Sequence, residues 1–272
     1  MEEKIEKSQE VNKKHKRASK VIFALAVILA VAIIFSIATA LVLLFFPVGE
    51  IEVVGDSRYN YSEIIEASGI KNGARLYYLN EERAEEKILS AFPYLESVEI
   101  KSHFPNRVKI EIKEFEDIYL VPHISGFCYV NGDFEILEIV KTAPDYDRFS
   151  GIFIKLEKCV EGDIGALCDG EDIKRAKDLI ELVKENGFYQ QLNIVDVENK
   201  YDNSFVVGKK YKFIIGAMTD ISEKMDAVFK VCSTDGFKAE NNAIINATNK
   251  KEIALRYVND EKIRQEFDFC QK

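Results

Sequence analysis

An uncharged apolar run near the N-terminus constrains this chain more than any other feature. Residues 21–46 contain no charged side chain, and their only polar side chains are the hydroxyls of Ser36 and Thr39. A helix rises about 1.5 Å per residue, so about 20 such residues cross a hydrocarbon core about 30 Å thick. The run also exceeds the usual length of an apolar stretch in a soluble protein. We therefore predict one transmembrane helix over residues 21–46.

The charges on either side of this run predict its orientation. Basic residues crowd in front of it, whereas none follows it before Arg58. Because Lys and Arg gather on the cytoplasmic side of membrane segments, we expect residues 1–20 to be a basic cytoplasmic tail and the rest to lie outside the cytoplasm. These charges predict a single-pass type II protein of the plasma membrane. The residues behind the prediction are Lys13, Lys14, Lys16, Arg17 and Lys20.

A cleavable signal peptide is the alternative to an anchor. Residues 38–40, Ala-Thr-Ala, have the small-x-small form of a cleavage site. However, the run far exceeds the roughly 7–15 apolar residues of a signal peptide, and cleavage after Ala40 would leave an apolar N-terminus. We favour an uncleaved anchor.

Length and charge limit what the remaining 226 residues can do. This length favours two domains. The whole chain has a net charge of −9, and because residues 1–20 carry +3, about −12 falls on the rest. Phosphate binding depends on clustered Lys and Arg, so this acidity argues against nucleic acid or anionic lipid as the main partner.

The cysteines form neither a disulfide framework nor a zinc motif. Five are scattered without a C-x-x-C pair, which favours buried thiols. A bridge between Cys159 and Cys168 remains an alternative. The full set is Cys128, Cys159, Cys168, Cys232 and Cys270.

The sequence pattern of residues 48–114 predicts a small α+β unit. Apolar spacing and stop signals, such as Gly69 after the first helix and Asn80 before the second, give the order strand, helix, helix, strand, strand. The predicted elements are 51–54, 61–68, 81–92, 98–101 and 108–113, the last two antiparallel.

Residues 115–260 predict a second α+β domain with a mostly antiparallel sheet. Asn131-Gly132 is typical of a two-residue hairpin turn, and Asp220 with Glu223 is an acidic variant of a capping box. The predicted elements are a hairpin within 127–137, a strand from 151, a helix over 173–186, strands at 192–197, 205–208 and 211–216, a helix from 221, and strands at 243–246 and 253–258.

Several of these segments resemble a POTRA domain. They are VGEIEVVG at 48–55, YSEII at 61–65, SGI at 68–70, FPYLESV at 92–98 and FPNRV at 104–108. A POTRA domain directly after one membrane helix is similar to the FtsQ/DivIB family of bacterial cell-division proteins. The stretch 211–224, a hairpin that runs through a glycine into a helix containing Lys224, resembles the centre of that family's β domain.

The resemblance implies a domain order and a function. We expect a POTRA domain over 47–114, an FtsQ/DivIB-type β domain over 115–260 and a C-terminal tail over 261–272. The implied function is a non-enzymatic scaffold of the divisome at the septum. It would recruit or stabilise FtsB/DivIC-like and FtsL-like single-pass partners and so help control septal peptidoglycan synthesis, with no cofactor and no small-molecule substrate.

The last predicted strand is the expected partner-binding edge. If one of its sides is unpaired, it can accept a strand from another protein, and Arg and Tyr are residue types that anchor interfaces. The expected contact residues are Ile253, Leu255, Arg256, Tyr257 and Val258. In the alternative, the tail covers the strand through Ile263, Phe267 and Phe269. On the POTRA domain, 51–54 and 98–101 are further candidate contact strands, although this domain can equally act as a spacer.

No catalytic or metal motif is visible in the sequence. His15, His103 and His123 stand in no metal spacing and beside no nucleophile motif, and the paired glutamates fit solvated helix starts and strand faces. Two other classes stay open: a membrane-anchored cell-wall enzyme, which requires a reactive pocket within 115–260, and a POTRA-bearing export adaptor, which normally accompanies an outer-membrane barrel.

Overall fold

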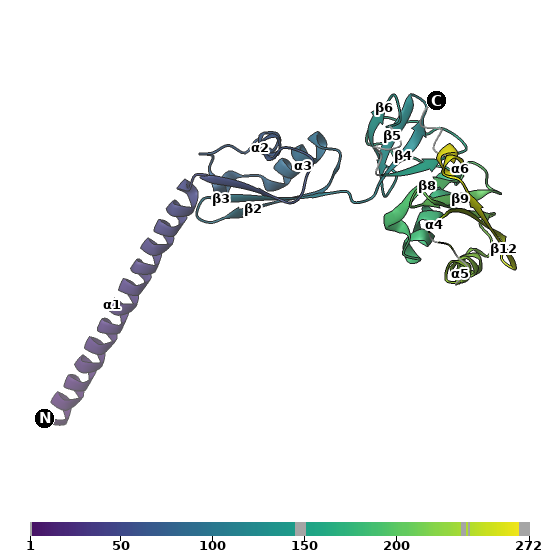
Figure 1. Ribbon diagram of the computed structural model, residues 1–272. Helices are drawn as coiled ribbons and strands as arrows, with labels where there is room; N and C mark the ends of the chain where they lie inside the picture. Colours follow the sequence, from purple (N-terminus) through teal and green to yellow (C-terminus); the bar gives the residue numbers. More distant parts are fainter. Residues whose placement is uncertain (1, 145–150, 235–237, 239, 267–272) are drawn as a thin grey trace. The chain divides into compact units, whose positions relative to one another are not determined.

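The structure is a computed structural model that describes residues 2–144, 151–234, 238 and 240–266 (Figure 1). The side chains of residues 2–19 and 42–45 lie outside this description. The chain divides into two compact units. The first holds residues up to 91 together with 97–113, and the second holds 92–96 together with the chain from 114 onward.

The N-terminal helix is longer than the predicted membrane segment. Helix α1 spans Glu2–Phe45, so it continues through the basic tail. The Lys and Glu residues of that tail are good helix formers, which explains the continuation. Within α1, the segment Lys20–Leu41 has a mean hydropathy of 3.1 and is long and apolar enough to cross a membrane. It is the one such helix in the described part of the chain.

The first unit contains a three-stranded sheet with two helices on one face (Figure 1). Its elements are β1 (Glu50–Val54), α2 (Tyr61–Ser68), the short 3-10 helix η1 (Leu76–Tyr78), α3 (Glu81–Ala91), β2 (Leu95–His103) and β3 (Arg107–Glu114). The strand order is β1-β3-β2, with β1 parallel to β3. The predicted order of strands and helices is therefore confirmed, whereas η1 was not foreseen.

Local signals in the sequence account for the helix ends of this unit. Gly69 ends α2 in the left-handed region at a φ of 70°. The side-chain oxygen of Asn80 accepts a hydrogen bond of 3.0 Å from the backbone N–H of Arg83 and so caps α3. Ile64 of α2 and Ile88 of α3 are fully buried.

The second unit is built on a nine-stranded, mostly antiparallel sheet. Its order is β12-β11-β10-β9-β8-β7-β4-β5-β6, and β10–β11, β7–β8 and β4–β7 are parallel pairs. The strands are β4 (Ile118–His123), β5 (Gly126–Asn131), β6 (Ile136–Val140), β7 (Ile152–Lys155), β8 (Leu192–Asp196), β9 (Asn203–Val207), β10 (Tyr211–Gly216), β11 (Asn242–Asn249) and β12 (Glu252–Val258).

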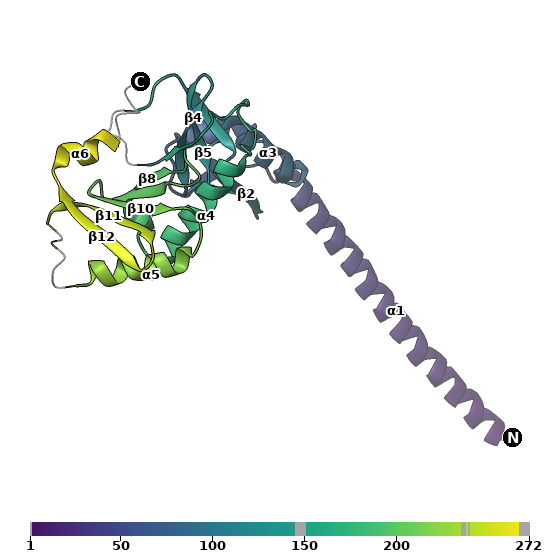
Figure 2. The same ribbon diagram turned by 90° about the vertical axis from the view of Figure 1, so that its right-hand side faces the viewer.

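Helices cover the two faces of this sheet unequally. Helices α4 (Glu171–Glu185) and α5 (Ile221–Cys232) lie on one face, while the short α6 (Asp260–Arg264) lies on the other (Figure 2). The short 3-10 helix η2 (Tyr189–Gln191) leads from α4 into β8. The main core lies beneath α4 and α5, where the rings of Phe205 and Phe213 stack at 4.8 Å between centroids.

One predicted turn differs from the structure. The Asn131 side-chain oxygen accepts hydrogen bonds of 3.0 Å from the N–H groups of Asp133 and Glu135, which organises a longer loop before β6. Phe134, rather than the Asn131-Gly132 pair, takes a positive φ, of 69°, and its ring is fully buried. The predicted two-residue turn is therefore wrong, because an asparagine side chain can brace a longer loop as well as enter a tight one.

The predicted capping box at α5 is also wrong. Asp220 adopts a φ of 53° and its side chain makes no capping hydrogen bond. Instead, Lys250 lies 3.2 Å from the Asp220 carboxylate and 2.6 Å from that of Glu223. Both carboxylates that a capping box would use are thus paired with Lys250, in the turn between β11 and β12.

The described cysteines are free thiols. Cys128 and Cys168 are buried, Cys232 is partly buried and Cys159 is exposed, so the bridge between Cys159 and Cys168 is not formed. A thiol hydrogen bond joins Cys128 to Cys168 and, together with burial, raises the pKa of Cys128. Cys270 lies outside the described residues.

Candidate partner-binding edge

Strand β12 forms one outer edge of the nine-stranded sheet. Among the described residues its strand neighbour is β11, with Ile244 opposite Arg256, Ile245 opposite Leu255 and Ala243 opposite Tyr257. All five residues expected to contact a partner therefore lie on an edge strand. An edge strand directs N–H and C=O groups away from the sheet, where another strand can pair with them.

Side chains of β12 alternate between the two faces of the sheet. Ile253 and Leu255 are half-buried and pack against the core under α5. Arg256 lies on the opposite face and is exposed. The hydroxyl of Tyr257, a residue 36% exposed, accepts a hydrogen bond of 2.7 Å from the N–H of Lys238. The edge thus presents one cationic and one aromatic side chain beside its backbone.

The C-terminal segment lies on the face of the sheet rather than along β12. Ile263 of α6 is fully buried against Ile194 of β8 and Val206 of β9. Beyond α6, the Glu266 carboxylate lies 2.7 Å from the Lys212 Nζ and 3.6 Å from the Lys155 Nζ. The tail contact expected of Ile263 exists, but within the described residues it does not cover the outer edge of β12. Phe267 and Phe269 lie outside the described residues.

The opposite edge of the sheet, β6, is partly occupied. The Ile136 N–H donates to the Ala166 carbonyl at 2.9 Å, and the Gly165 N–H donates to the Ile136 carbonyl at 2.8 Å. A bridge between Glu135 and Leu167 extends this cover. A loop of the unit itself therefore uses part of the β6 backbone, which makes β12 the better candidate for strand addition.

A buried lysine binds the end of β10, behind the candidate edge. Lys224 of α5 is 4% exposed, and its Nζ donates to the carbonyls of Ile215 at 3.0 Å and Ala217 at 2.7 Å. Burial lowers the pKa of Lys224, and the nearby Asp220 charge opposes this shift. The sequence singled out the stretch that contains Lys224 but not this role, because an isolated lysine is normally solvated.

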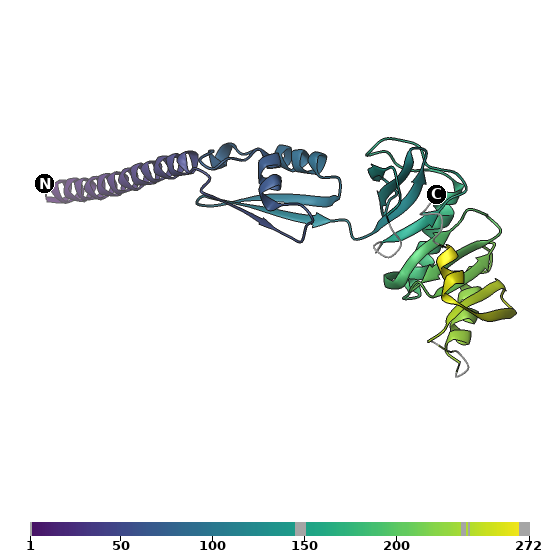
Figure 3. The same cartoon turned by 45° about the horizontal axis from the view of Figure 1, so that its top comes forward.

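The first unit has two edge strands of its own. Both predicted contact strands, within β1 and β2, lie at edges because β3 occupies the centre of the sheet (Figure 3). Exposed ion pairs flank them, with the Arg107 Nε 2.7 Å from the Glu50 carboxylate and the Lys101 Nζ 2.7 Å from that of Glu99. Charged side chains of this kind discourage unspecific strand pairing.

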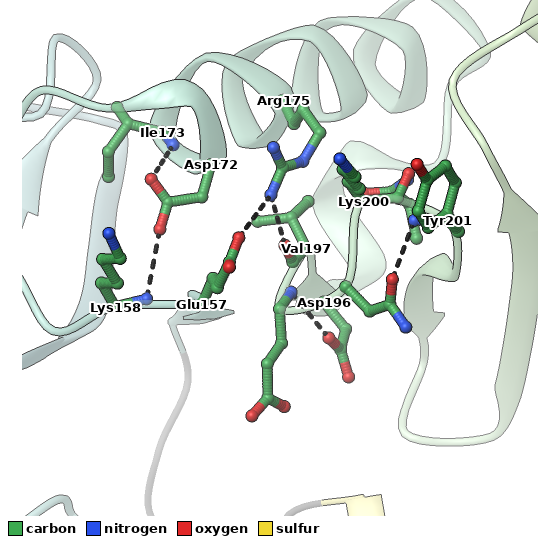
Figure 4. Close-up of polar contacts among 12 residues, drawn as sticks. Glu157, Lys158, Asp172, Ile173, Arg175, Asp196, Val197, Lys200 and Tyr201 are labelled. Atoms are coloured by element: carbon green, nitrogen blue, oxygen red, sulfur yellow. Dashed lines mark hydrogen bonds and ion pairs between the residues drawn. The ribbon is translucent and has the colours of Figure 1, made fainter.

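The second unit also has a cavity of about 550 Å³ beside the start of α4. Its charged lining residues are mainly acidic, and it contains no histidine; it comprises Glu157, Lys158, Cys159, Val160, Glu161, Leu167, Cys168, Asp169, Gly170, Glu171 and Asp172. Several of these groups have structural contacts, as Figure 4 shows. Asp172 accepts from the N–H groups of Lys158 and Ile173, and Glu157 lies 3.9 Å from Arg175.

The remaining residues that the sequence analysis named are the histidines and the basic residues of the tail. His123 is buried, its Nδ1 accepts from the Ser125 N–H at 3.1 Å, and its Nε2 lies 3.0 Å from the Gly162 carbonyl oxygen. Among described residues no group of three or more His, Cys, Asp or Glu side chains is arranged for a metal. Lys20 begins the candidate span, and Lys13, Lys14, Lys16 and Arg17 precede it in α1, with side chains outside the description.

Comparison with known proteins adds two findings. A family model described as "POTRA domain, FtsQ-type" matches residues 46–115. The chain is 24% identical to the "Cell division protein DivIB" of Clostridium botulinum (strain Hall), over 88% of the chain and 91% of that protein. It is 25% identical to the DivIB of Clostridium acetobutylicum, over 72% and 77% of the two chains, and 29% identical to the "Cell division protein FtsQ" of Corynebacterium glutamicum, over 36% and 42%.

Proposed function

We propose that this chain, which belongs to the FtsQ/DivIB family of bacterial cell-division proteins, is a non-enzymatic scaffold of the divisome. In this role it holds FtsB/DivIC-like and FtsL-like single-pass proteins at the septum and so helps control septal peptidoglycan synthesis. The role requires contacts rather than chemistry, and it is compatible with the absence of a metal arrangement among the described residues.

The observation that carries the proposal is the outer edge of β12. A seven-residue strand with β11 on one side can accept an extended segment on the other through main-chain hydrogen bonds. Arg256 and Tyr257 stand beside that backbone and supply the side-chain contacts that select a partner. The described part of the tail lies on the sheet face and leaves this edge accessible.

Membrane anchoring strengthens contacts of this kind. We place the basic residues before Lys20 in the cytoplasm and both units outside it, in agreement with the distribution of Lys and Arg. Partners tethered in the same membrane meet the chain at a raised effective concentration, so that a short strand contact suffices. The first unit acts as a spacer in this proposal, and its edge strands are secondary candidates for binding.

A pair of proline substitutions in β12 tests the edge directly. Successive backbone N–H groups of a strand point to opposite sides, so Ala254→Pro and Leu255→Pro remove one N–H facing β11 and one facing outward. Each full-length variant is co-expressed with the DivIC-like and FtsL-like proteins of the same organism and purified from membranes. Hydrogen exchange of β11 identifies the variant whose sheet remains intact.

We expect the variant with an intact β11 to lose co-purification of the partners, because the missing N–H and the proline ring then face the added strand. Glu52→Pro in β1 is the matched control in the first unit, and its partner binding should persist. If the β12 variant with an intact sheet still binds the partners fully, β12 is not the binding edge. Loss of binding by the β1 variant alone would move the interface to the first unit.

A further inference from the structure

The end of the first unit next to α1 carries unusually exposed aromatic side chains. Tyr77, Tyr78 and Phe104 are 66%, 64% and 62% exposed. They come from two segments far apart in the sequence, η1 and the connection between β2 and β3. We propose that this aromatic end, defined as Tyr77, Tyr78 and Phe104, binds the interfacial layer of the bilayer that α1 crosses.

Short-range contacts join the aromatic end to the end of the apolar run. The Leu76 N–H donates to the Phe46 carbonyl at 3.2 Å, and the rings of Phe46 and Phe104 meet edge to face at 5.1 Å. Pro47 forms a bridge with Arg75. Tyr77 follows Leu76 directly, so its backbone lies within a few ångströms of Phe46.

The length of the apolar run places that contact near the headgroup layer. The run over residues 21–46 ends at Phe46, and at the rise of a helix it measures about 39 Å, more than the hydrocarbon core of about 30 Å. The headgroup layer is roughly 5–8 Å thick on each side of the hydrocarbon core. The aromatic end therefore lies at the depth of this layer, and any tilt of α1 brings it deeper.

The chemistry of these side chains fits the interface. Tyrosine joins an apolar ring to a polar hydroxyl, and such residues gather where hydrocarbon meets water. The two tyrosine rings are 5.5 Å apart in an edge-to-face arrangement, so they form one contiguous apolar surface. Because insertion of aromatic rings does not depend on lipid charge, the proposal is compatible with the acidic character of the chain outside α1.

The opposite end of β1 provides an internal control. Tyr61 is 43% exposed, and its hydroxyl donates at 2.6 Å to the carbonyl of Gly55, directly after β1. Five residues of strand separate that end from the aromatic end, or about 17 Å. A contact confined to the aromatic end leaves Tyr61 in water. Tyr201 of the second unit, 68% exposed, is a further solvent reference.

Single tryptophans test the proposal, because the chain contains no tryptophan of its own. The full chain is reconstituted into phosphatidylcholine nanodiscs as the variants Tyr77→Trp, Tyr78→Trp, Phe104→Trp, Tyr61→Trp and Tyr201→Trp. The emission wavelength is measured, and quenching by lipids brominated near the top of the acyl chain is compared across the variants. The same set is repeated with anionic phosphatidylglycerol.

We expect emission at shorter wavelength and strong loss of intensity by brominated lipid for the three aromatic-end variants in both lipids, with neither effect for Tyr61→Trp or Tyr201→Trp. Emission from the aromatic-end variants that matches Tyr201→Trp would overturn the proposal. So would quenching restricted to anionic lipid, or equal quenching of Tyr61→Trp. The proposal rests on the membrane anchor alone, so its failure leaves partner binding at β12 untouched.

Discussion

The two sheets of this protein expose edges in different ways. In the three-stranded sheet, β2 and β3 are joined by three residues, whereas β1 pairs with β3 across α2, α3 and β2. The nine-stranded sheet pairs β4 with β7 across β5 and β6, and β10 with β11 across α5. Its edge β6 is partly covered by a loop, while β12 is not covered by the described part of the tail.

This difference supports the separate roles that we propose for the two units. A small sheet with charged edges suits a spacer between a membrane and a binding site. A large sheet that protects one edge and leaves the other accessible suits strand addition. Four predictions test how independent the two units are and what holds each together, from the largest expected effect to the smallest.

Removal of a core ring should destabilise one unit alone. Phe213→Ala removes a nearly fully buried ring stacked on Phe205 and should lower the free energy of unfolding of the second unit by about 3–5 kcal/mol. Hydrogen exchange of the full chain in detergent reports each unit separately. Ile110→Ala, fully buried in β3, is the matched variant of the first unit. Equal loss of protection in both units after either change would contradict their independence.

Replacement of the buried lysine should cost about 1–3 kcal/mol of unfolding free energy. Lys224→Met keeps the side chain's length but leaves the carbonyls of Ile215 and Ala217 without this donor. Because the pKa of Lys224 in the fold is below its usual 10.5, the unfolded chain binds more protons between the two values. The stability of the natural protein should therefore gain from Lys224 as pH rises through this window.

Urea denaturation of both proteins from pH 7 to pH 10 measures this effect. The stability difference between the natural protein and Lys224→Met should grow with rising pH. Lys230→Met, at an exposed position in the last turn of α5, is the control and should show no such trend. A constant difference across this range would refute the link between Lys224 titration and stability.

The two predicted helix caps should respond differently to substitution. Asn80→Ala should cost about 1 kcal/mol in the first unit because it removes the capping bond to Arg83. Asp220→Gly should change the second unit by less than about 0.5 kcal/mol, because glycine accepts the φ of 53° and the lost ion pair with Lys250 is exposed. Thermal denaturation measures both. If the two substitutions lower stability equally, Asp220 does act as a cap of α5.

The smallest expected effect concerns the tail. Glu266→Gln removes the carboxylate between Lys155 and Lys212 and should lower the stability of the tail's contact by about 1 kcal/mol or less. The loss should shrink modestly as salt is added, since salt screens a partly buried ion pair less than an exposed one. Hydrogen exchange of α6 at low and high salt measures it. Glu261→Gln, exposed in α6, is the control. A loss that does not depend on salt would exclude an electrostatic role.

Local patterns in the sequence were sufficient for much of the fold. Alternation in β2 and β3, the apolar face of α4 and the cap at Asn80 depend on neighbours within a few residues, so each was predicted close to its observed bounds. β4 was missed and the turn after Asn131 was mistaken. In both places the local pattern permits more than one conformation, and contacts with β5, β7 and the buried Phe134 ring decide between them.

The prediction of β12 as the binding edge has the same limit, because local patterns alone do not decide it. Its residues and strand character were read from alternation between Ile253 and Val258, but whether that strand ends the sheet depends on where the tail lies. Ile263 contacts strands more than fifty residues earlier in the chain, and Lys224 finds its carbonyl partners only when α5 lies on the sheet. Such contacts depend on which distant strands pair.

The sequence by itself determined the apolar N-terminal helix, the α+β class and the resemblance to FtsQ/DivIB proteins, because apolar length, periodicity and short motifs are local properties of the chain. Only the tertiary structure decided that β12 is an outer strand, that a loop protects β6 and that the aromatic end gathers beside Phe46. These features arise when segments far apart in the chain come together, and no single segment determines the free energy of that assembly.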